Sequence, residues 1–307
     1  MDVPIAPAPA ATPVTVGAVS ERAQARRETI RQLLKRPAFL VGIVVLLGWV
    51  LTAILGERIT PYDPFNDFAL NHQPPGQVAV PGQDVTEFHL FGTDRLGRDV
   101  LSRVMVGSRD VLVVAPLAAI FGVTAGTLLG LVMGFYRGLI DDVLSRLVEA
   151  FLALPVILVA LLTLVVLGPS PAVVVAVVGI LFTPIVARTV RSAVLSERQL
   201  DYVTSAKLRG ESGLFILSRE IFPNVLAPVV VELTVRFGYA IFTVATLSFL
   251  GVGIQPPSPD WGLSIAEEYS YMISGVWWST VFPALAIAST VVAINFIADS
   301  LQSVLAE

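Results

Sequence analysis

The chain has 307 residues, of which 55% are hydrophobic and only 14% carry a charged side chain. Soluble domains carry about 25% charged residues, so this composition indicates a protein that crosses a membrane several times. The chain contains no cysteine, which excludes disulfides, thiolate metal sites and a cysteine nucleophile. The net charge of −4 says little, because in membrane proteins the placement of Lys and Arg matters more than their sum.

The N-terminal 36 residues are predicted to lie outside the membrane. Residues 1–20 are rich in Pro and Ala and nearly uncharged, which is typical of a disordered tail. Residues 21–36 hold six Arg and Lys, which predicts either a short amphipathic helix at the membrane surface or a charge cluster that only fixes orientation. The following apolar run is long for a signal peptide and no small-residue cleavage site follows it, so we expect an uncleaved first span.

Six segments are long and apolar enough to cross a bilayer, which requires about 20 residues. The predicted fold class is therefore an all-α polytopic membrane protein with six transmembrane helices. Segment 37–56 is the first span, 57–110 an extracytoplasmic segment, and 111–307 a core domain with the other five spans. The six apolar runs are Phe39–Leu55, Val111–Phe135, Leu147–Leu167, Ala172–Val190, Val225–Leu250 and Val281–Ala298.

The basic residues predict the orientation. If the N-terminus is cytoplasmic, segments 1–36, 136–146 and 188–222 face the cytoplasm and together hold 14 of the 20 Lys and Arg. Residues 57–109 hold five and the loop 251–279 holds none. Both ends of the chain are therefore predicted to be cytoplasmic.

Catalytic chemistry is not indicated by the sequence. There is no Gly-Lys pair, so the GxxxxGK[ST] loop that cradles nucleotide phosphates is missing. The two histidines, His72 and His89, have no second ligand at metal-binding spacing, which argues against a membrane zinc protease or a Ser–His enzyme. We expect no catalytic residue, no metal site, no cofactor and no nucleic-acid partner.

Two ionisable residues are predicted to lie deep in the fifth span. Glu232 and Arg236 are spaced i, i+4 and share one helix face. They either line a translocation path or form a self-neutralised pair that stabilises a helix contact, for instance with a second subunit. Phe237, Phe242 and Phe249 are expected either to form an apolar gate or to be lipid-facing or packing groups. An ion-coupled carrier is disfavoured, because two residues make a poor proton relay and no inverted repeat is evident.

A polar island, Asp201–Asn224, separates the fourth and fifth apolar runs. Asp201 is predicted to cap a first short surface helix, and Gly210 to turn the chain. The letters LFILSREIF predict a second amphipathic piece, and Pro223 is expected to begin the next span. The island either docks onto a partner or is a solvated connection.

The island YVTSAKLRGESGLFILSREIFPN resembles the cytoplasmic EAA-type loop of ABC-importer permease subunits, which forms coupling helices that dock into ATPase subunits. It departs from the pattern at Glu220, where many relatives have histidine, and at Thr204–Ser205, which replace part of an alanine-rich start. The positions that match recurring residues are Tyr202, Ala206, Gly210, Arg219, Pro223 and Asn224. Within the loop 195–222, the resemblance implies ATPase contacts by Asp201, Tyr202, Ala206, Lys207, Leu208, Arg209, Gly210 and Glu211.

Two further stretches narrow the family. HLFGTDRLGRDVLSRVMVGSR, residues 89–109, resembles the segment before the second span in dipeptide, oligopeptide and nickel permeases, and LSFLGVGIQPPSPDWG, residues 247–262, resembles their loop after the fifth span. The residues themselves predict that Thr93 or Asp94 caps a helix, that Arg98 and Asp99 form a local ion pair, and that Trp261 follows a Gly/Pro turn at an interface. The residues expected in loops on the side of the binding protein are Asp94, Arg98, Asp99, Pro257 and Trp261.

The resemblance runs from about Leu33 to Ala298 and is to the DppC/OppC-like member of the permease pair. It implies a type I ABC-importer permease fold and half of a translocation pathway in the bacterial cytoplasmic membrane. The implied partners are a sister permease, two ATPase subunits that hold ATP and Mg, and an extracytoplasmic substrate-binding protein. Di- or oligopeptides are the preferred cargo, and nickel chelates or another small ligand are the alternative.

Overall fold

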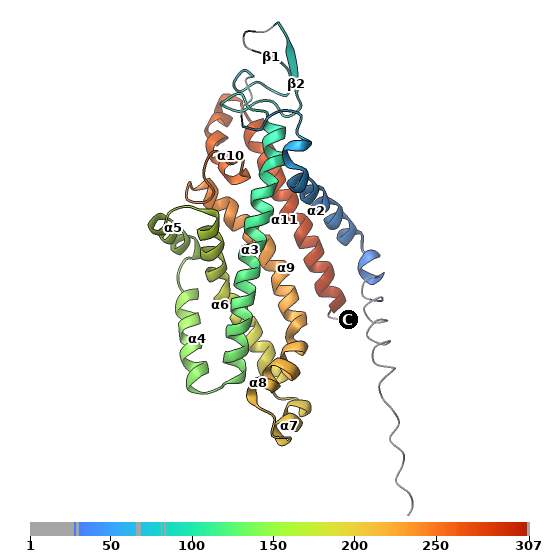
Figure 1. Ribbon diagram of the computed structural model, residues 1–307, viewed down its shortest axis with the longest axis vertical. Coiled ribbons are helices and arrows are strands. Elements are labelled where there is room, and N and C mark those ends of the chain that lie inside the picture. The colour runs from blue at the N-terminus through green and yellow to red at the C-terminus, as the bar shows by residue number, and fades with distance from the viewer. Residues whose placement is uncertain (1–27, 29–30, 66–68, 81, 83, 306–307) are drawn as a thin grey trace, which may run out of the picture.

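The computed structural model describes residues 28, 31–65, 69–80, 82 and 84–305. The predicted tail 1–20 and most of the basic segment 21–36 lie outside the described residues. Five helices in the described part are long and apolar enough to cross a membrane, and they form one elongated bundle (Figure 1). These are α2 Pro37–Leu55, α3 Val100–Phe135, α6 Pro171–Glu197, α9 Phe222–Phe249 and α11 Trp278–Leu305. Five of the six expected spans are therefore confirmed.

The third expected span is broken. Instead of one helix over 147–167, the chain forms α4 Leu139–Leu152 and α5 Val156–Leu167, bent by 86° at the break. Pro155 explains the bend, because proline disfavours the helical conformation of the preceding residue and lacks the N–H that would bond to the previous turn. The prediction of a continuous third helix is wrong, although the bent pair together counts as a sixth candidate span.

The core is built on an unusually close contact between α3 and α6. Four glycines recur every fourth residue along the α3 face that meets α6, which lets the two backbones approach. A Cβ added to Gly126 would lie 2.6 Å from Cβ of Val186, and one added to Gly130 would lie 2.6 Å from the carbonyl oxygen of Ala187. The main hydrophobic cluster continues from this contact onto α9 and α11.

A short hairpin and two small helices cover one end of the bundle, here called the hairpin end. Strands β1 Gly76–Ala79 and β2 Thr86–His89 pair antiparallel, with Gly76 opposite His89; the all-α prediction missed this pair. The one-turn helix η1 Gly56–Arg58 follows α2 at this end. Beside the hairpin lie α10 Trp261–Glu268 and the 3₁₀ turn η3 Tyr269–Ser274.

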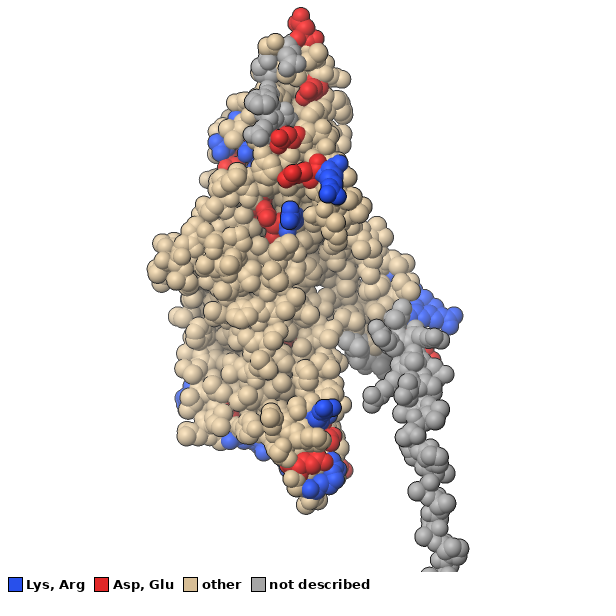
Figure 2. All heavy atoms as spheres, viewed as in Figure 1, with Lys and Arg blue, Asp and Glu red and all other residues tan. Residues whose placement is uncertain are grey.

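The opposite end, here called the α7 end, carries α7 Asp201–Leu208, α8 Gly213–Phe215 and the π-helical turn η2 Ile216–Ile221. Charged side chains on the visible face gather at both ends and leave a nearly uncharged band between them (Figure 2). The guanidinium of Arg36, just before α2, donates to the hydroxyl of Ser303 near the end of α11. The start of the first span and the end of the last span therefore meet, and both point toward the α7 end. That this end faces the cytoplasm stays a prediction.

Candidate functional site

The island at the α7 end begins with a short helix that Asp201 does not cap. Leu200 occupies the N-cap position without a side-chain hydrogen bond, and Asp201 is the first helical residue. In this first turn its carboxylate interacts favourably with the positive end of the helix dipole. Gly210 follows with φ +78, a conformation that glycine adopts at little cost. The prediction of a cap at Asp201 is wrong, and the predicted turn at Gly210 is confirmed.

The second piece of the island is not a separate surface helix. From Gly213 to Phe249 the chain is one helical rod of 37 residues, which passes through the π turn η2 into α9. A proline inside a helix clashes with the carbonyl four residues earlier, and a widened π turn relieves such a conflict. The wide turn directly before Pro223 therefore lets the helix continue where the sequence indicated a new start.

Hydrogen bonds hold α7 against both of its long neighbours. The Tyr202 hydroxyl donates to Oε2 of Glu197 at 2.7 Å, and Nδ2 of Asn224 donates to the same hydroxyl at 3.1 Å. Burial and the bond to Glu197 raise the pKa of Tyr202 to about 12, so the hydroxyl stays a donor at neutral pH. Val203 and Ala206 are fully buried beneath α7. The island is therefore fixed to the end of α6 and the start of α9.

The outward side of the island is apolar and carries charges of both signs. Leu208 is 85% exposed and Leu214 is 70% exposed. Beside them Nε of Arg209 contacts Oε1 of Glu211 at 2.7 Å, and the same guanidinium reaches Glu220 at 3.4 Å. The eight residues expected to contact an ATPase therefore divide. Tyr202 and Ala206 anchor the helix, and Glu211 is half-buried beside Arg209. The exposed ones are Asp201, Lys207, Leu208, Arg209 and Gly210.

At the hairpin end, Asp94 folds back onto its own loop instead of capping a helix. Its Oδ1 accepts from the backbone N–H groups of Leu96 at 2.8 Å and Arg98 at 3.0 Å, and its Oδ2 accepts from Nε of Arg98 at 2.7 Å. Nε of Arg103 lies 3.5 Å from the same Oδ2. The predicted Thr93/Asp94 cap and the predicted Arg98/Asp99 pair are both wrong, because the tight loop places Asp94 opposite Arg98.

Asp99 is the residue that caps α3. Its Oδ2 accepts from the backbone N–H of Ser102 at 2.7 Å, and its Oδ1 lies 2.9 Å from Nδ1 of the buried His89. The imidazole of His89 stacks on Tyr62 with ring centroids 4.3 Å apart. This cap explains why α3 begins at Val100, well before the apolar run that predicted the span.

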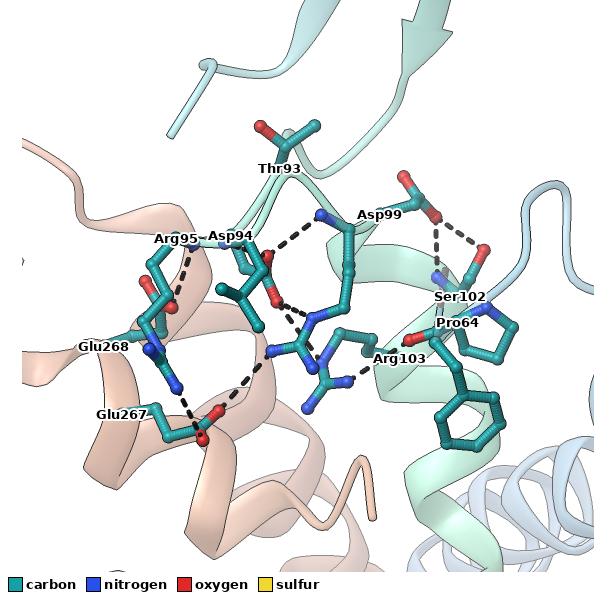
Figure 3. Close-up of polar contacts among 12 residues, drawn as sticks. Pro64, Thr93, Asp94, Arg95, Asp99, Ser102, Arg103, Glu267 and Glu268 are labelled. Carbon is teal, nitrogen blue, oxygen red and sulfur yellow. Dashed lines mark hydrogen bonds and ion pairs between the residues drawn. The ribbon is translucent and has the colours of Figure 1, made fainter. Parts of the chain in front are cut away.

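Two acidic residues of α10, which the sequence analysis did not single out, join the loop to the bundle. Oε1 of Glu267 lies 2.9 Å from Arg95 and its Oε2 lies 3.5 Å from Arg98. Glu268 accepts from the backbone N–H of Arg95 at 3.1 Å and contacts Nε2 of His72 at 3.1 Å. Figure 3 shows Arg95 of the loop, Arg103 of α3 and the two glutamates of α10 on the same side of the cluster. Segment 57–109 holds seven Asp and Glu against five Arg, so no excess of basic residues pointed to a partner in α10.

Trp261 lies inside the protein rather than at an interface. It is fully buried, its indole N–H donates to the carbonyl of Val104 at 2.8 Å, and its ring meets Trp49 edge-on at 4.9 Å. The interface prediction is wrong because α10 packs against α3, α9 and α11. Asp260 caps α10 by accepting from Leu263 at 2.9 Å, and burial raises the pKa of Asp260 to about 6.

Pro257 borders a cavity of about 570 Å³ at the hairpin end. Charged groups of Glu57, Arg109 and Asp110 line it together with the residues that precede α6. Of the five residues expected in binding-protein loops, Pro257 therefore lies at an accessible cavity, and the other four are buried. Their contact with a binding protein stays a prediction.

The predicted pair in α9 forms within the chain. Nε of Arg236 lies 2.9 Å from Oε2 of Glu232, and the Thr189 hydroxyl of α6 donates to Oε1 at 2.9 Å. The Arg236 guanidinium also lies 5.2 Å from the ring centroid of Tyr239, which adds a cation–π contact. Both charged side chains are 13% exposed. This geometry agrees with both predicted roles of the Glu232/Arg236 pair, the lining of a translocation path and a contact with a second subunit.

The aromatic residues near this pair do not share one face. Phe237 packs against the main core cluster, whereas Phe242 is 60% exposed. Phe249 meets Tyr269 at 5.5 Å. Within the described residues, no group of three or more His, Cys, Asp and Glu is placed to hold a metal ion.

Comparisons with known proteins agree with this architecture. Residues 126–307 match the family model described as binding-protein-dependent transport system inner membrane component, and residues 25–75 match the N-terminal transmembrane domain of oligopeptide transport permease C. A putative peptide transport system permease protein of Brucella suis is 39% identical over 90% of each chain.

Two other relatives carry more specific names. The di/tripeptide transport system permease protein of Pseudomonas aeruginosa is 38% identical over 86% of each chain. The glutathione transport system permease protein of Pectobacterium atrosepticum is 36% identical over 91% of this chain and 90% of its own length. The chain thus belongs to the binding-protein-dependent inner membrane components, as an integral membrane permease subunit of the dipeptide and oligopeptide branch of ABC importers.

Proposed function

We propose that this chain forms half of the translocation pathway of an ATP-driven importer of di- and oligopeptides. A sister permease supplies the other half, two ATPase subunits bind ATP and Mg, and an extracytoplasmic binding protein delivers the peptide. The chain itself is not catalytic. The observation that carries the proposal is the exposed turn between α7 and α8, which is fixed to both α6 and α9.

The turn has the character of a docking surface. Exposed leucines at 208 and 214 flank a glycine turn whose neighbours carry charges of both signs. Apolar patches on a protein surface mark interaction sites when they are contiguous and rimmed by polar groups. Because Gly213–Phe249 is one rod, a displacement of the docked turn is carried directly to Glu232 and to its contact with Thr189. We infer that this rod is the mechanical link between ATP-driven closure and the change of access.

The cargo assignment rests on the printed names of the relatives. They cover peptides, dipeptides, di/tripeptides and glutathione, whose shared chemistry is a short peptide with free terminal charges. We further propose that the α7 end faces the cytoplasm, because segments 1–36, 136–146 and 188–222 hold 14 of the 20 Lys and Arg. The hairpin end then faces the binding protein.

Docking is tested by the charge substitution Leu208→Glu. It leaves folding intact, because the side chain is 85% exposed, but it places an acid in the proposed contact. We expect loss of ATPase copurification and of substrate-stimulated ATP hydrolysis in the reconstituted assembly. The matched control for ATPase copurification is Ile273→Glu, since Ile273 is 96% exposed at the opposite end. Normal coupling in Leu208→Glu would reject the docking surface.

The cargo is tested by titrating the reconstituted wild-type assembly with dipeptides, longer peptides and nickel chelates. Stimulation of ATP hydrolysis by peptides is the expected result. Stimulation by nickel chelates alone would keep the coupling role and reject peptide cargo. Uptake that follows a proton gradient and needs no ATP would reject the whole assignment.

A further inference from the structure

A polar groove lies between α6 and α9 in the half of the bundle nearer the α7 end. Its volume is about 530 Å³. Lipid-facing grooves are lined by apolar side chains, whereas hydroxyl groups and a guanidinium line this one. The lining residues are Arg188, Thr189, Ser192, Ala193, Ser196 and Pro228.

The groove follows one face of α6. Arg188, Ser192 and Ser196 are spaced four residues apart, so they lie on one helix face, and all three are exposed. A different face of α6 packs against the glycines of α3. At about 1.5 Å per residue, Arg188 lies about 13 Å from the Glu197 end of α6. A charged group therefore lies on an uncovered face of α6, where the apolar run Ala172–Val190 ends.

Arg188 differs from two other arginines on the long helices. Arg191, three residues away, pairs with Asp141 at 2.6 and 2.7 Å, and Arg236 pairs with Glu232 at 2.9 Å. Within the described part of the chain, no carboxylate lies within ion-pair distance of Arg188. An ionisable residue inside a span faces a water-filled path or a partner, because exposure to lipid is costly. The groove thus carries an unneutralised positive charge.

We propose that this groove is the inner wall of the translocation path and that Arg188 contacts the C-terminal carboxylate of a passing peptide. The proposal rests on the peptide-importer function proposed above. A peptide carboxylate has a pKa of about 3.5 and is charged at neutral pH. A guanidinium binds a carboxylate through two parallel hydrogen bonds. The hydroxyls of Ser192 and Ser196 donate to and accept from peptide groups of any sequence, which suits a path for varied cargo.

The first test asks whether the groove is wet and positively charged, whatever the cargo. The chain has no cysteine, so Ser192→Cys introduces a single thiol into the assembly, with cysteines of the partner subunits replaced. Inside-out vesicles are treated with a sulfonate-bearing and an ammonium-bearing thiol reagent of equal size. We expect labelling of Ser192→Cys, several-fold faster with the sulfonate. The matched control is Leu162→Cys, which is 69% exposed on the apolar α5 and should not react.

Adding Arg188→Gln to Ser192→Cys should equalise the two labelling rates. Equal labelling rates in Ser192→Cys alone would overturn the proposal, because the groove would then not be positively charged. Absence of labelling both with and without ATP would also overturn it, because the sister subunit or lipid would then cover this face. Co-purification of the sister permease with Arg188→Gln provides a separate readout. Loss of the heterodimer would identify Arg188 as a subunit contact and likewise overturn the proposal.

The second test addresses the carboxylate. Uptake of a dipeptide with a free C-terminus is compared with uptake of its C-terminal amide by wild type, Arg188→Lys and Arg188→Gln. We expect Arg188→Gln to lower the free-acid to amide uptake ratio about tenfold, the effect of losing one charge-assisted contact, and Arg188→Lys to lower it less. An unchanged ratio would overturn the carboxylate contact. Absence of peptide uptake by wild type, with charge-selective labelling intact, would instead reject the peptide cargo and leave the charged path standing.

Discussion

The polar clusters at the two ends of this permease subunit are organised in different ways. At the hairpin end, Asp94 is buried and bonds to the loop and to Arg98, and Glu267 neutralises the neighbouring Arg95. At the α7 end, Leu208 is 85% exposed, and Arg188 in the adjoining groove has no carboxylate partner among the described residues. Charged side chains that are all paired within the chain serve to fix the loop that carries them. Side chains that stay exposed or unpaired indicate a surface that another molecule contacts.

The largest expected effect comes from breaking the completed network. Asp94→Ala leaves the guanidinium groups of Arg98 and Arg103 buried without their shared carboxylate. We expect a loss of about 3–5 kcal/mol, the cost of leaving a buried charge unpaired. The measurement is the denaturation midpoint of the purified protein in detergent. The control is Glu87→Ala, whose side chain is 40% exposed. A similar, small loss in both variants would show that the network does not brace the loop.

A pH dependence of about 3 kcal/mol is expected from Asp260 at the same end. Burial raises its pKa in the native protein to about 6, above the unfolded value of about 3.9. The native state therefore holds the proton more tightly, so this contribution is complete below about pH 4 and is lost as the pH rises through 6. Asp260→Asn keeps an oxygen for the cap but does not titrate. Stability measured from pH 4 to 7 should vary less in the variant than in wild type, and identical profiles would contradict the assignment.

A middle-sized effect is expected from the α9 pair, which lies between the two ends. If Glu232 and Arg236 form a structural pair, Glu232→Gln alone leaves a guanidinium that is 13% exposed without its charge partner. We expect a loss of about 1–3 kcal/mol in the single variant, and a smaller loss when Arg236→Gln is added. Detergent stability and subunit assembly provide the measurement. Unchanged stability with equal loss of transport in both variants would favour a path lining.

The smallest effect on stability, with a large effect on coupling, is expected at Gly210. A Cβ at this position meets nothing within 4 Å, so Gly210→Trp costs only the strain of φ +78, about 1 kcal/mol. The bulky ring would nevertheless block docking of the turn. Gly210→Asn is the control, because asparagine tolerates this conformation and is small. Normal substrate-stimulated ATP hydrolysis in Gly210→Trp would show that the turn at Gly210 is not needed for coupling.

The errors of the sequence predictions share one cause. Asp94, Asp99, Arg98 and Arg103 lie within ten residues of one another, and composition alone allows several pairings. The loop conformation selects Asp94 with Arg98 and leaves Asp99 to cap α3. In the same way, sequence showed that Trp261 follows a turn, but only the packing of α10 against α3 and α9 placed it in the core.

The sequence by itself determined the number and approximate position of the apolar runs, the turn at Gly210 and the family. These depend on local composition, on the backbone freedom of one residue and on matched motifs. Only the tertiary structure decided the break at Pro155, the joining of α8 to α9 through a π turn, and the groove that exposes Arg188. Each of these depends on which helices are neighbours. The neighbouring helices decide whether a proline is tolerated within a helix and whether an arginine finds a partner.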